Sequence, residues 1–231
     1  MSTHINPSSI FIIIPAHNEG NVIQSVLKQI TGFPYSVVVM DDGSDKSLFS
    51  SLKNLPVYFL RHRLNLGQGA ALQTGIEFAV SKNASYIITF DADGQHDPGD
   101  IKKLIDILNS SSSDIVFGSR FLKGAIHNMP VKRKIVLQAA RFLNYIFTGI
   151  LLSDAHNGLR AMNKKAASAI QLKENRMAHA TEILYQVKKN KLKYTEVPVT
   201  VRYTPYSIKK GQTTKNSFRI LLDIILNKLF K

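Results

Sequence analysis

Two carboxylates, Asp91 and Asp93, lie two residues apart directly after an apolar run. The run 86–90 predicts a strand, and the ends of strands are where open α/β sheets bind their ligands. In an extended chain both side chains would point to the same side. Hard oxygen ligands of this kind suit Mg²⁺ or Mn²⁺ that also bridges to phosphates. An Asp-x-Asp sequence alone is more typical of a solvated turn, so its interpretation depends on the rest of the chain.

Apolar runs and helical patterns alternate along the first half of the chain. Because strands that alternate with helices form parallel sheets, the pattern predicts an α/β fold with a Rossmann-like, mostly parallel central sheet and helices on both faces. Asn18 and Pro98 stand where two of these helices would begin. The predicted strands are 10–14, 37–40, 57–60, 86–90 and 114–117, and the predicted helices are 18–30, 69–81 and 98–108.

The pattern changes after residue 118. It predicts a helix over 131–152, a strand over 193–203 and an amphipathic C-terminal helix over 218–230. The apolar faces of the two helices could be buried in the core, or could lie on an anionic membrane, which basic amphipathic helices bind. No linker or repeat interrupts the chain, so we expect one domain over 1–231.

The net charge of +14 is concentrated in the second half of the chain. Residues 1–115 hold 8 Lys and Arg against 11 Asp and Glu, whereas residues 116–231 hold 22 against 5. The basic half must therefore meet nucleic acid, an anionic lipid surface or a phosphorylated acceptor, or else form a solvated surface. Because the chain has no RNP, zinc or helix-turn-helix signature, we expect no nucleic-acid partner.

The composition excludes several classes of protein. There is no Cys, which excludes disulfides, thiolate nucleophiles and zinc–thiolate sites. Residues 1–9 lack the basic and apolar parts of a secretory signal. The apolar run 142–152 is far shorter than the roughly 20 residues that a membrane-spanning helix needs, so we expect no transmembrane segment.

Six motifs occur in an order that is informative as a set. They are Ile14–Glu19, Asp41–Ser44, Asn65–Gly69, Asp91–Gln95, Gly118–Arg120 and Asp154–Arg160. Together they resemble the inverting family 2 glycosyltransferases of the GT-A fold, over about residues 10–205. The chain is most similar to the dolichol- or polyprenyl-phosphate hexosyltransferase subgroup. It departs from that subgroup at residues 203–215, where the usual Gly-x-Ser-Lys element is altered, and it lacks the C-terminal transmembrane helices of some members.

The resemblance implies that residues 1–117 bind a nucleotide sugar and that Mg²⁺ or Mn²⁺ contacts its diphosphate. The metal positions correspond to Asp91, Asp93 and Gln95. Gly69 would permit close backbone approach, or would simply begin a helix. The positions that correspond to the nucleotide-sugar site are Pro15, Ala16, Asn18, Glu19, Asp41, Asp42, Gly69 and Asp91.

The resemblance also implies that residues 118–231, the basic half, face the acceptor and the membrane. Arg120 resembles the arginine that meets the acceptor phosphate in the family. As parts of the basic half, Lys132, Arg133 and Arg202 would lie near the anionic membrane or the acceptor, and we expect Arg133 and Arg202 near the acceptor phosphate. A planar guanidinium suits phosphate better than a point charge does. The expected catalytic residues are Asp93, Arg120 and Asp154.

The chemistry of the acceptor decides whether a base is needed. A phosphate monoester has a second pKa of about 6 and is already an anionic nucleophile near neutrality. Asp154 would then orient Arg160, the sugar or the metal shell. A hydroxyl acceptor, such as the end of a growing polysaccharide, needs a general base, for which Asp154 and Glu182 are the candidates.

We therefore expect a metal-dependent hexosyltransferase that uses a UDP- or GDP-linked donor and a polyprenyl or dolichyl phosphate acceptor. It would be a peripheral protein at the cytoplasmic face of the membrane. A silent sugar-nucleotide-binding protein would share the fold. A nucleotidyltransferase would need a Gly-rich triphosphate loop near the N-terminus, which residues 15–19 do not supply. The sequence leaves open the nucleobase of the donor, the sugar that is transferred and the oligomeric state.

Overall fold

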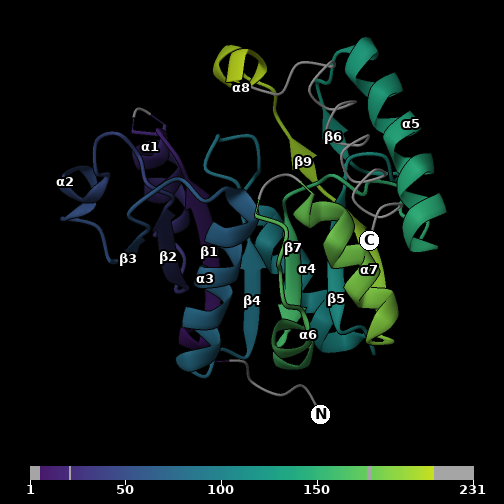
Figure 1. Cartoon of the computed structure of the whole chain (residues 1–231), viewed down its shortest axis with the longest axis horizontal. Helices are drawn as coiled ribbons and strands as arrows, with labels where there is room; N and C mark the ends of the chain where they lie inside the picture. Colours follow the sequence, from purple (N-terminus) through teal and green to yellow (C-terminus); the bar gives the residue numbers. More distant parts are fainter. Residues whose placement is uncertain (1–5, 21, 176–177, 211–231) are drawn as a thin grey trace.

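The computed structural model describes residues 6–20, 22–175 and 178–210. A seven-stranded sheet in the order β3-β2-β1-β4-β7-β5-β8 forms its centre (Figure 1). Neighbouring strands pair in parallel except for β7, which runs antiparallel to both β4 and β5. The strands are β1 (Ile10–Ala16), β2 (Ser36–Asp41), β3 (Val57–Arg61), β4 (Tyr86–Thr89), β5 (Ile115–Ser119), β7 (Arg160–Asn163) and β8 (Tyr194–Pro198).

The central strands have continuous apolar runs because helices cover both faces of the sheet. In β1 all residues are buried. Ile12 and Ile14 pack on the face covered by α1 and α4, whereas Phe11 and Ile13 pack on the face covered by α3, α6 and α7 (Figure 1). The helices are η1 (Pro7–Ser9), α1 (Ile23–Ile30), α2 (Phe49–Leu52), α3 (Gln68–Ser81), α4 (Gly99–Ser110), α6 (Lys164–Ala169) and α7 (His179–Lys189).

A second, two-stranded sheet joins late segments of the chain to the loop after β4. Its strands β6 (Ile126–His127) and β9 (Thr200–Val201) pair in parallel, and His96 forms a bridge to Val201. The helix α5 (Val131–Thr148) lies at the outer side of this sheet, and α8 (Pro205–Lys210) lies above β9 in the view of Figure 1. The pairing brings residues near 200 to the loop that carries Asp91 and Asp93.

The predicted α/β class and the mostly parallel sheet are confirmed. Three predictions of element boundaries are wrong. The helix predicted from Asn18 begins at Ile23, and Asn18 itself has a left-handed backbone with φ of 57° instead of the extended backbone usual for an Asn N-cap. The helix predicted over 131–152 ends at Thr148, where Gly149 takes the left-handed C-cap conformation. The strand predicted over 193–203 is divided into β8 and β9.

Other elements were not predicted from the sequence, or cannot be compared. The strand β7 and the helices α6 and α7 were missed. The helix predicted over 218–230 lies outside the described residues. Within the described part of the chain, no helix combines the length and the apolar character that crossing a membrane requires.

Asp114 joins the starts of β5 and β8 to the end of β7, at the end of the sheet opposite to Asp91. Its Oδ2 accepts hydrogen bonds from the backbone N–H of Lys193 at 2.9 Å and from Nζ of Lys165 at 2.9 Å. Its Oδ1 accepts one from Nδ2 of Asn163 at 3.2 Å. Burial favours the neutral acid, but the bonds from Lys165, Lys193 and Asn163 lower the pKa of Asp114 below its usual value.

We expect Asp114→Ala to lower the free energy of unfolding by about 2–4 kcal/mol, because charge-assisted hydrogen bonds are lost and the Lys193 N–H is left without this acceptor. The contribution is present above the unfolded pKa of about 3.9 and disappears as pH falls through the lower folded pKa. Urea unfolding at a series of pH values measures both effects. The exposed Asp106, which pairs with Lys102, is the control, and Asp106→Ala should change stability by at most about 0.5 kcal/mol.

Candidate active site

Asp91 lies at the centre of a polar cluster just after β4. Its Oδ1 accepts a hydrogen bond from Nε2 of Gln68 at 3.1 Å, and its Oδ2 lies 3.1 Å from Nε2 of His96. The backbone of Gly158 packs against the carboxylate so closely that a Cβ there would lie 2.1 Å from Oδ2. Burial would raise the pKa of Asp91, but the hydrogen bond from His96 and nearby positive charges, including Arg160, lower it. Asp91 is therefore held as a carboxylate.

Asp93 is the second carboxylate, and its environment is different. Its Oδ1 accepts the backbone N–H of Gln95 at 3.0 Å, and its Oδ2 accepts Nε2 of the same residue at 2.6 Å. Burial, the charge of Asp91 and the charge of Glu19 raise the pKa of Asp93. Two like charges at one site repel each other, and a bound cation would relieve that repulsion.

The two carboxylates fit a divalent cation only in combination with a ligand. Among the residues that the structure describes, no group of three or more His, Asp or Glu side chains could hold a metal alone. Mg²⁺ is commonly held by one or two carboxylates together with substrate phosphates, and the hard oxygens of Asp91 and Asp93 fit that arrangement. Gln95 donates from its amide nitrogen to Asp93 and so helps to position that carboxylate, and the predicted place of Gln95 in the metal site stays a prediction.

Asp41 is fully buried at the end of β2 and holds the following turn. Its Oδ1 accepts the N–H of Ser44 at 2.9 Å, and its Oδ2 accepts the N–H of Leu48 at 3.3 Å. Nε of Arg61 lies 3.4 Å from Oδ2. The carboxylate thus shapes the loop, and its contact with a nucleoside stays a prediction.

Asp42 plays the same part for the next loop. Its oxygens accept the N–H groups of Leu66 at 3.0 Å and Gly67 at 2.7 Å, and Nδ1 of His62 lies 2.8 Å away. His62 in turn contacts Thr74 of α3 through Nε2 at 3.0 Å. Asp42 therefore fixes the chain that leads into α3, and it orients a histidine that the sequence did not single out.

The end of β1 and the loop after it are hydrogen-bonded to the turn that follows β2. Pro15 and Ala16 end β1, and the carbonyl of Ala16 accepts the N–H of Asp42 at 2.8 Å. The side chain of Asn18 donates to Asp45 at 3.1 Å and accepts from its N–H at 3.0 Å. Asn18 makes these bonds from a left-handed backbone, and it thus connects two loops and does not cap a helix.

A buried ion pair joins two of the predicted catalytic residues. Arg120 donates through Nε to Oδ2 of Asp154 and through Nη2 to Oδ1, both at 2.6 Å, and its backbone N–H reaches Oδ2 at 3.0 Å. Despite burial, this guanidinium lowers the pKa of Asp154, and the carboxylate raises that of Arg120. Asp154 is thus a poor proton acceptor.

The segment after β9 crosses the site, and of its residues only Arg202 was predicted to contribute to it. The OH of Tyr203 accepts a hydrogen bond from Nη1 of Arg120 at 2.7 Å, and the guanidinium of Arg133 lies 5.0 Å from the centre of the Tyr203 ring. Arg202 donates its backbone N–H to the carbonyl of Gln95 at 2.8 Å, while its side chain is exposed. Of the three arginines predicted near the acceptor phosphate, Arg202 thus belongs to this segment, and Arg120 and Arg133 contact its Tyr203.

The same segment reaches the loop after β1. The OH of Tyr206 in α8 donates to the carboxylate of Glu19, a residue 187 positions earlier. Burial and the negative charge of Glu19 raise the pKa of Tyr206, which therefore stays protonated and keeps donating near neutral pH. Glu19 is buried, so its predicted place beside the nucleotide sugar stays a prediction.

Glu182 and Gly69 both form hydrogen bonds with the backbone of the loop before α7. The Glu182 carboxylate accepts the N–H groups of Lys173 at 3.0 Å and Glu174 at 2.9 Å. Gly69 donates its N–H to Asn175 at 2.8 Å, and a Cβ on Gly69 would lie 1.9 Å from the carbonyl oxygen of Glu174. The close approach expected at Gly69 is therefore made by the protein's own loop.

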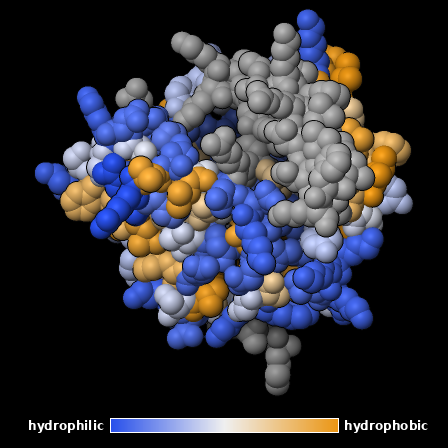
Figure 2. All heavy atoms as spheres, in the orientation of Figure 1, coloured by the Kyte–Doolittle hydropathy of each residue, from blue (hydrophilic) through white to orange (hydrophobic). Residues whose placement is uncertain are grey.

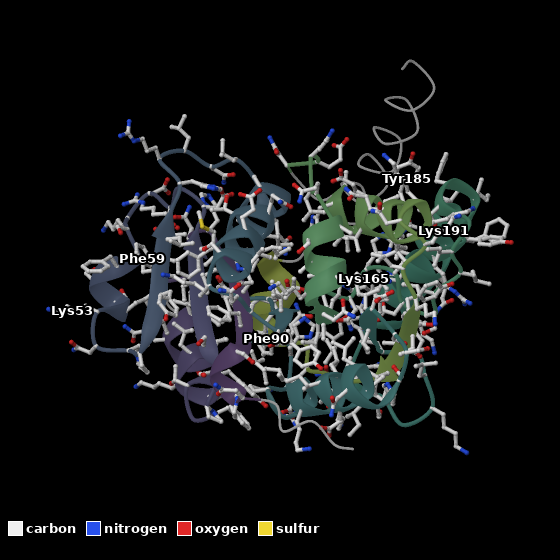
Figure 3. All side chains as sticks on the ribbon, turned by 90° about the horizontal axis from the view of Figure 1, so that it is seen from below. Lys53, Phe59, Phe90, Lys165, Tyr185 and Lys191 are labelled. Atoms are coloured by element: carbon white, nitrogen blue, oxygen red, sulfur yellow. The ribbon has the colours of Figure 1, made fainter. Side chains whose placement is uncertain are left out.

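The basic residues of the second half lie at both ends of the sheet. Arg133 and Arg202 lie near the site, whereas Lys165 and Lys191 lie near the ends of β7 and α7 that are remote from Asp91. Figure 3, a view from that remote end, shows both lysines in the half that carries α7. The positive charge therefore does not all face the predicted acceptor.

Comparisons with known proteins agree with this geometry. A model of glycosyl transferase family 2 matches residues 11–171. The UDP-N-acetylglucosamine–dolichyl-phosphate N-acetylglucosaminyltransferase of Methanococcus voltae is 32% identical over 243 residues, which cover 96% of this chain and 97% of that protein. The dolichol-phosphate mannosyltransferase of Pyrococcus furiosus is 30% identical over 215 residues, which cover 87% of this chain and 59% of that protein.

A third relative is an uncharacterised protein of Methanocaldococcus jannaschii, 38% identical over 98% of this chain and 95% of its own length. Among solved structures, glucosyl-3-phosphoglycerate synthase from Mycobacterium tuberculosis, in complex with Mn²⁺, UDP-glucose and phosphoglyceric acid, superposes with a TM-score of 0.68 at 18% identity. That match covers 93% of this chain and 78% of the synthase, and it shows the fold. The chain belongs to glycosyl transferase family 2, and its fold is GT-A.

Proposed function

We propose that this glycosyltransferase moves a hexose from a UDP- or GDP-linked donor to a polyprenyl or dolichyl phosphate, with inversion at the anomeric carbon. An acceptor phosphate oxygen forms the new bond to that carbon. The bond between the carbon and the nucleoside diphosphate breaks, and its electron pair leaves with the diphosphate.

The ion pair of Arg120 with Asp154 is the observation that carries the proposal. A hydroxyl acceptor needs a base, but both oxygens of Asp154 accept from Arg120, and its pKa is lowered. The carboxylate of Glu182 accepts backbone N–H groups of a loop instead. An acceptor that is already anionic, such as a phosphate monoester, needs neither residue as a base.

The remaining donors near the ion pair support a phosphate acceptor. A guanidinium has five N–H donors, and Arg120 uses three of them on Asp154 and Tyr203. The two remaining N–H donors of Arg120 would bind the acceptor phosphate together with Arg133, whose guanidinium lies over the ring of the same Tyr203. Asp91 and Asp93 would hold Mg²⁺ or Mn²⁺, which when bound stabilises the charge that develops on the leaving diphosphate.

The names of two relatives support the same acceptor class, since both describe transfer to dolichyl or dolichol phosphate. The Methanococcus voltae protein matches this chain over nearly the whole length of both, so its donor, UDP-N-acetylglucosamine, is the first donor to test here.

The outer face of α5 supports a peripheral position on the membrane. Val131, Ile135, Phe142 and Ile146 are spaced by 4, 7 and 4 residues, which places them on one side of the helix, and all four are exposed. Figure 2 shows hydrophobic residues at the right-hand edge of the molecule, where α5 lies. Exposed apolar side chains beside basic ones, as in 132–134, suit an anionic lipid surface.

The reaction class is tested by transfer from labelled UDP- and GDP-sugars, UDP-N-acetylglucosamine first, to a short polyprenyl phosphate. We expect labelled lipid that depends on Mg²⁺ or Mn²⁺ and disappears with EDTA. The rate at limiting acceptor should rise with pH through about 6 as the phosphate loses its second proton. Transfer to sugar hydroxyls, without labelled lipid, would refute the proposed acceptor.

Asp93→Ala should reduce transfer by at least about 10³-fold while the protein stays folded, because the leaving diphosphate loses electrostatic stabilisation worth several kcal/mol. Circular dichroism checks the fold. Asp106→Ala is the control, since Asp106 is exposed on α4 and pairs with Lys102, and it should keep most of the activity. Normal turnover by Asp93→Ala would contradict the metal assignment.

Replacement of both Ile135 and Phe142 by Glu should weaken sedimentation with anionic vesicles about tenfold or more, because two apolar anchors are lost and two like charges are added. Replacement of both Phe49 and Leu64 by Glu is the matched control, since these residues are 56% and 72% exposed but lie in α2 and after β3, at the other edge of the sheet. Equal losses in both proteins would show that α5 is not the membrane face.

A further inference from the structure

Two buried hydrogen-bond donors next to Asp91 have no partner among the residues that the structure describes. They are Nδ2 of Asn157 and Nη1 of Arg160, and the two residues are only 3% and 2% exposed. Buried donors of this kind are rare in native proteins, because each costs about 1–3 kcal/mol. A pair of them within four residues of one loop indicates a ligand.

The loop that carries these donors is fixed against the metal-site carboxylate. Arg160 is the first residue of β7 and pairs in register with Thr89, two residues before Asp91. The hydroxyl of Thr89 donates to the carbonyl of Gly158 at 2.6 Å, and Gly158 itself packs on Asp91. The loop therefore cannot recede from the site without breaking both contacts.

The amide of Asn157 is also oriented. Its Oδ1 accepts the backbone N–H of Leu159 at 2.9 Å, so only Nδ2 is left to interact with another group. Asn157 thus presents a donor and not an acceptor.

The charges around Arg160 identify the class of ligand. Burial lowers the pKa of Arg160 to about 10, and the charges of Asp91 and Asp154 oppose that shift, which puts the guanidinium close to both carboxylates. Asp154 is already neutralised by Arg120. The charge of Arg160 is therefore balanced by the carboxylates that it faces, and Arg160 has no surplus positive charge for a phosphate other than the acceptor phosphate proposed at Arg120 and Arg133. Neutral hydroxyl oxygens suit these donors better than an anion does.

We propose that Asn157 and Arg160 bind ring hydroxyl groups of the hexose that is transferred, and so determine which sugar the enzyme accepts. The inference rests on the proposed function, and it adds the residues that select the sugar. A site built to hydrogen-bond a hydroxyl discriminates strongly against an analogue that lacks it, because the buried donors then stay unpaired.

Calorimetric binding of a nucleotide sugar and of the matching nucleoside diphosphate, both with Mg²⁺, tests the inference without turnover. The donor is the one that the transfer assay identifies. We expect Asn157→Ala and Arg160→Lys to weaken binding of the nucleotide sugar about tenfold or more, and to change binding of the diphosphate by less than about twofold. The exposed Asn54→Ala is the control and should bind both ligands as the unmodified protein does.

Asn157→Asp guards against misfolding, because it keeps the acceptor for Leu159. It replaces the donor by a carboxylate oxygen, so its weaker binding of the diphosphate measures the added negative charge, and its further loss for the nucleotide sugar measures the missing donor. Equal weakening of both ligands would assign the pair to the diphosphate and overturn the inference, and so would unchanged binding in folded variants. If the unmodified protein bound the diphosphate as tightly as every nucleotide sugar, the inference about the sugar would be wrong while the proposed function would stand. If the unmodified protein bound neither ligand, both the inference and the proposed function would be wrong.

Deoxy donors identify the hydroxyl. A donor that lacks the bound hydroxyl should bind the unmodified protein about tenfold more weakly, and Asn157→Ala should add little to that loss, since the same hydrogen bond is removed twice. Fully additive losses at every ring position would show that Asn157 does not contact the sugar.

Discussion

The ion pair between Arg120 and Asp154 determines what the rest of the site can do. Arg120 follows β5 and Asp154 belongs to the loop that leads to β7, so the pair joins the ends of two strands. Glu196 in β8 holds the same loop by accepting the N–H of Ser153 at 2.9 Å, and Tyr203 extends the network to the segment after β9. A buried pair of this kind is costly to break, because one partner alone would be an uncompensated charge. The part of the site around Arg120 is therefore held by several buried contacts, and Asp154 is not free to act as a base.

Five aspartates of this chain divide into two groups by what their oxygens contact. Asp41, Asp42 and Asp114 accept backbone N–H groups and fix loops at strand ends. Asp91 and Asp93 accept from side chains or from their own loop, and they repel each other. Backbone donors cannot leave without unfolding the loop, whereas a repulsive carboxylate pair gains from a cation. This difference separates carboxylates that build the site from those that would bind a metal.

Much of the fold could be predicted because continuous apolar runs and strand–helix alternation are local features. The strand β7 could not, since it is four residues long and begins with the buried cation Arg160. The motif residues were found at the strand ends, as expected, but their roles were not visible. Asp42 contacts residues 24 and 25 positions away, and Tyr203 contacts Arg120 from 83 positions away. Contacts at such separations depend on the sheet order, which the local pattern does not specify.

The helix α5 links the membrane proposal to the acceptor proposal. Arg133 lies on a different side of the helix from the apolar stripe, and it stacks on Tyr203, which bonds to Arg120. One rigid helix would thus contact lipid with one face and the acceptor phosphate with another. A polyprenyl phosphate has the same two parts, an apolar chain and an anionic head. Binding at the membrane surface would place the phosphate near the arginines while the chain stays in lipid, so little of the binding free energy would be used to extract the acceptor.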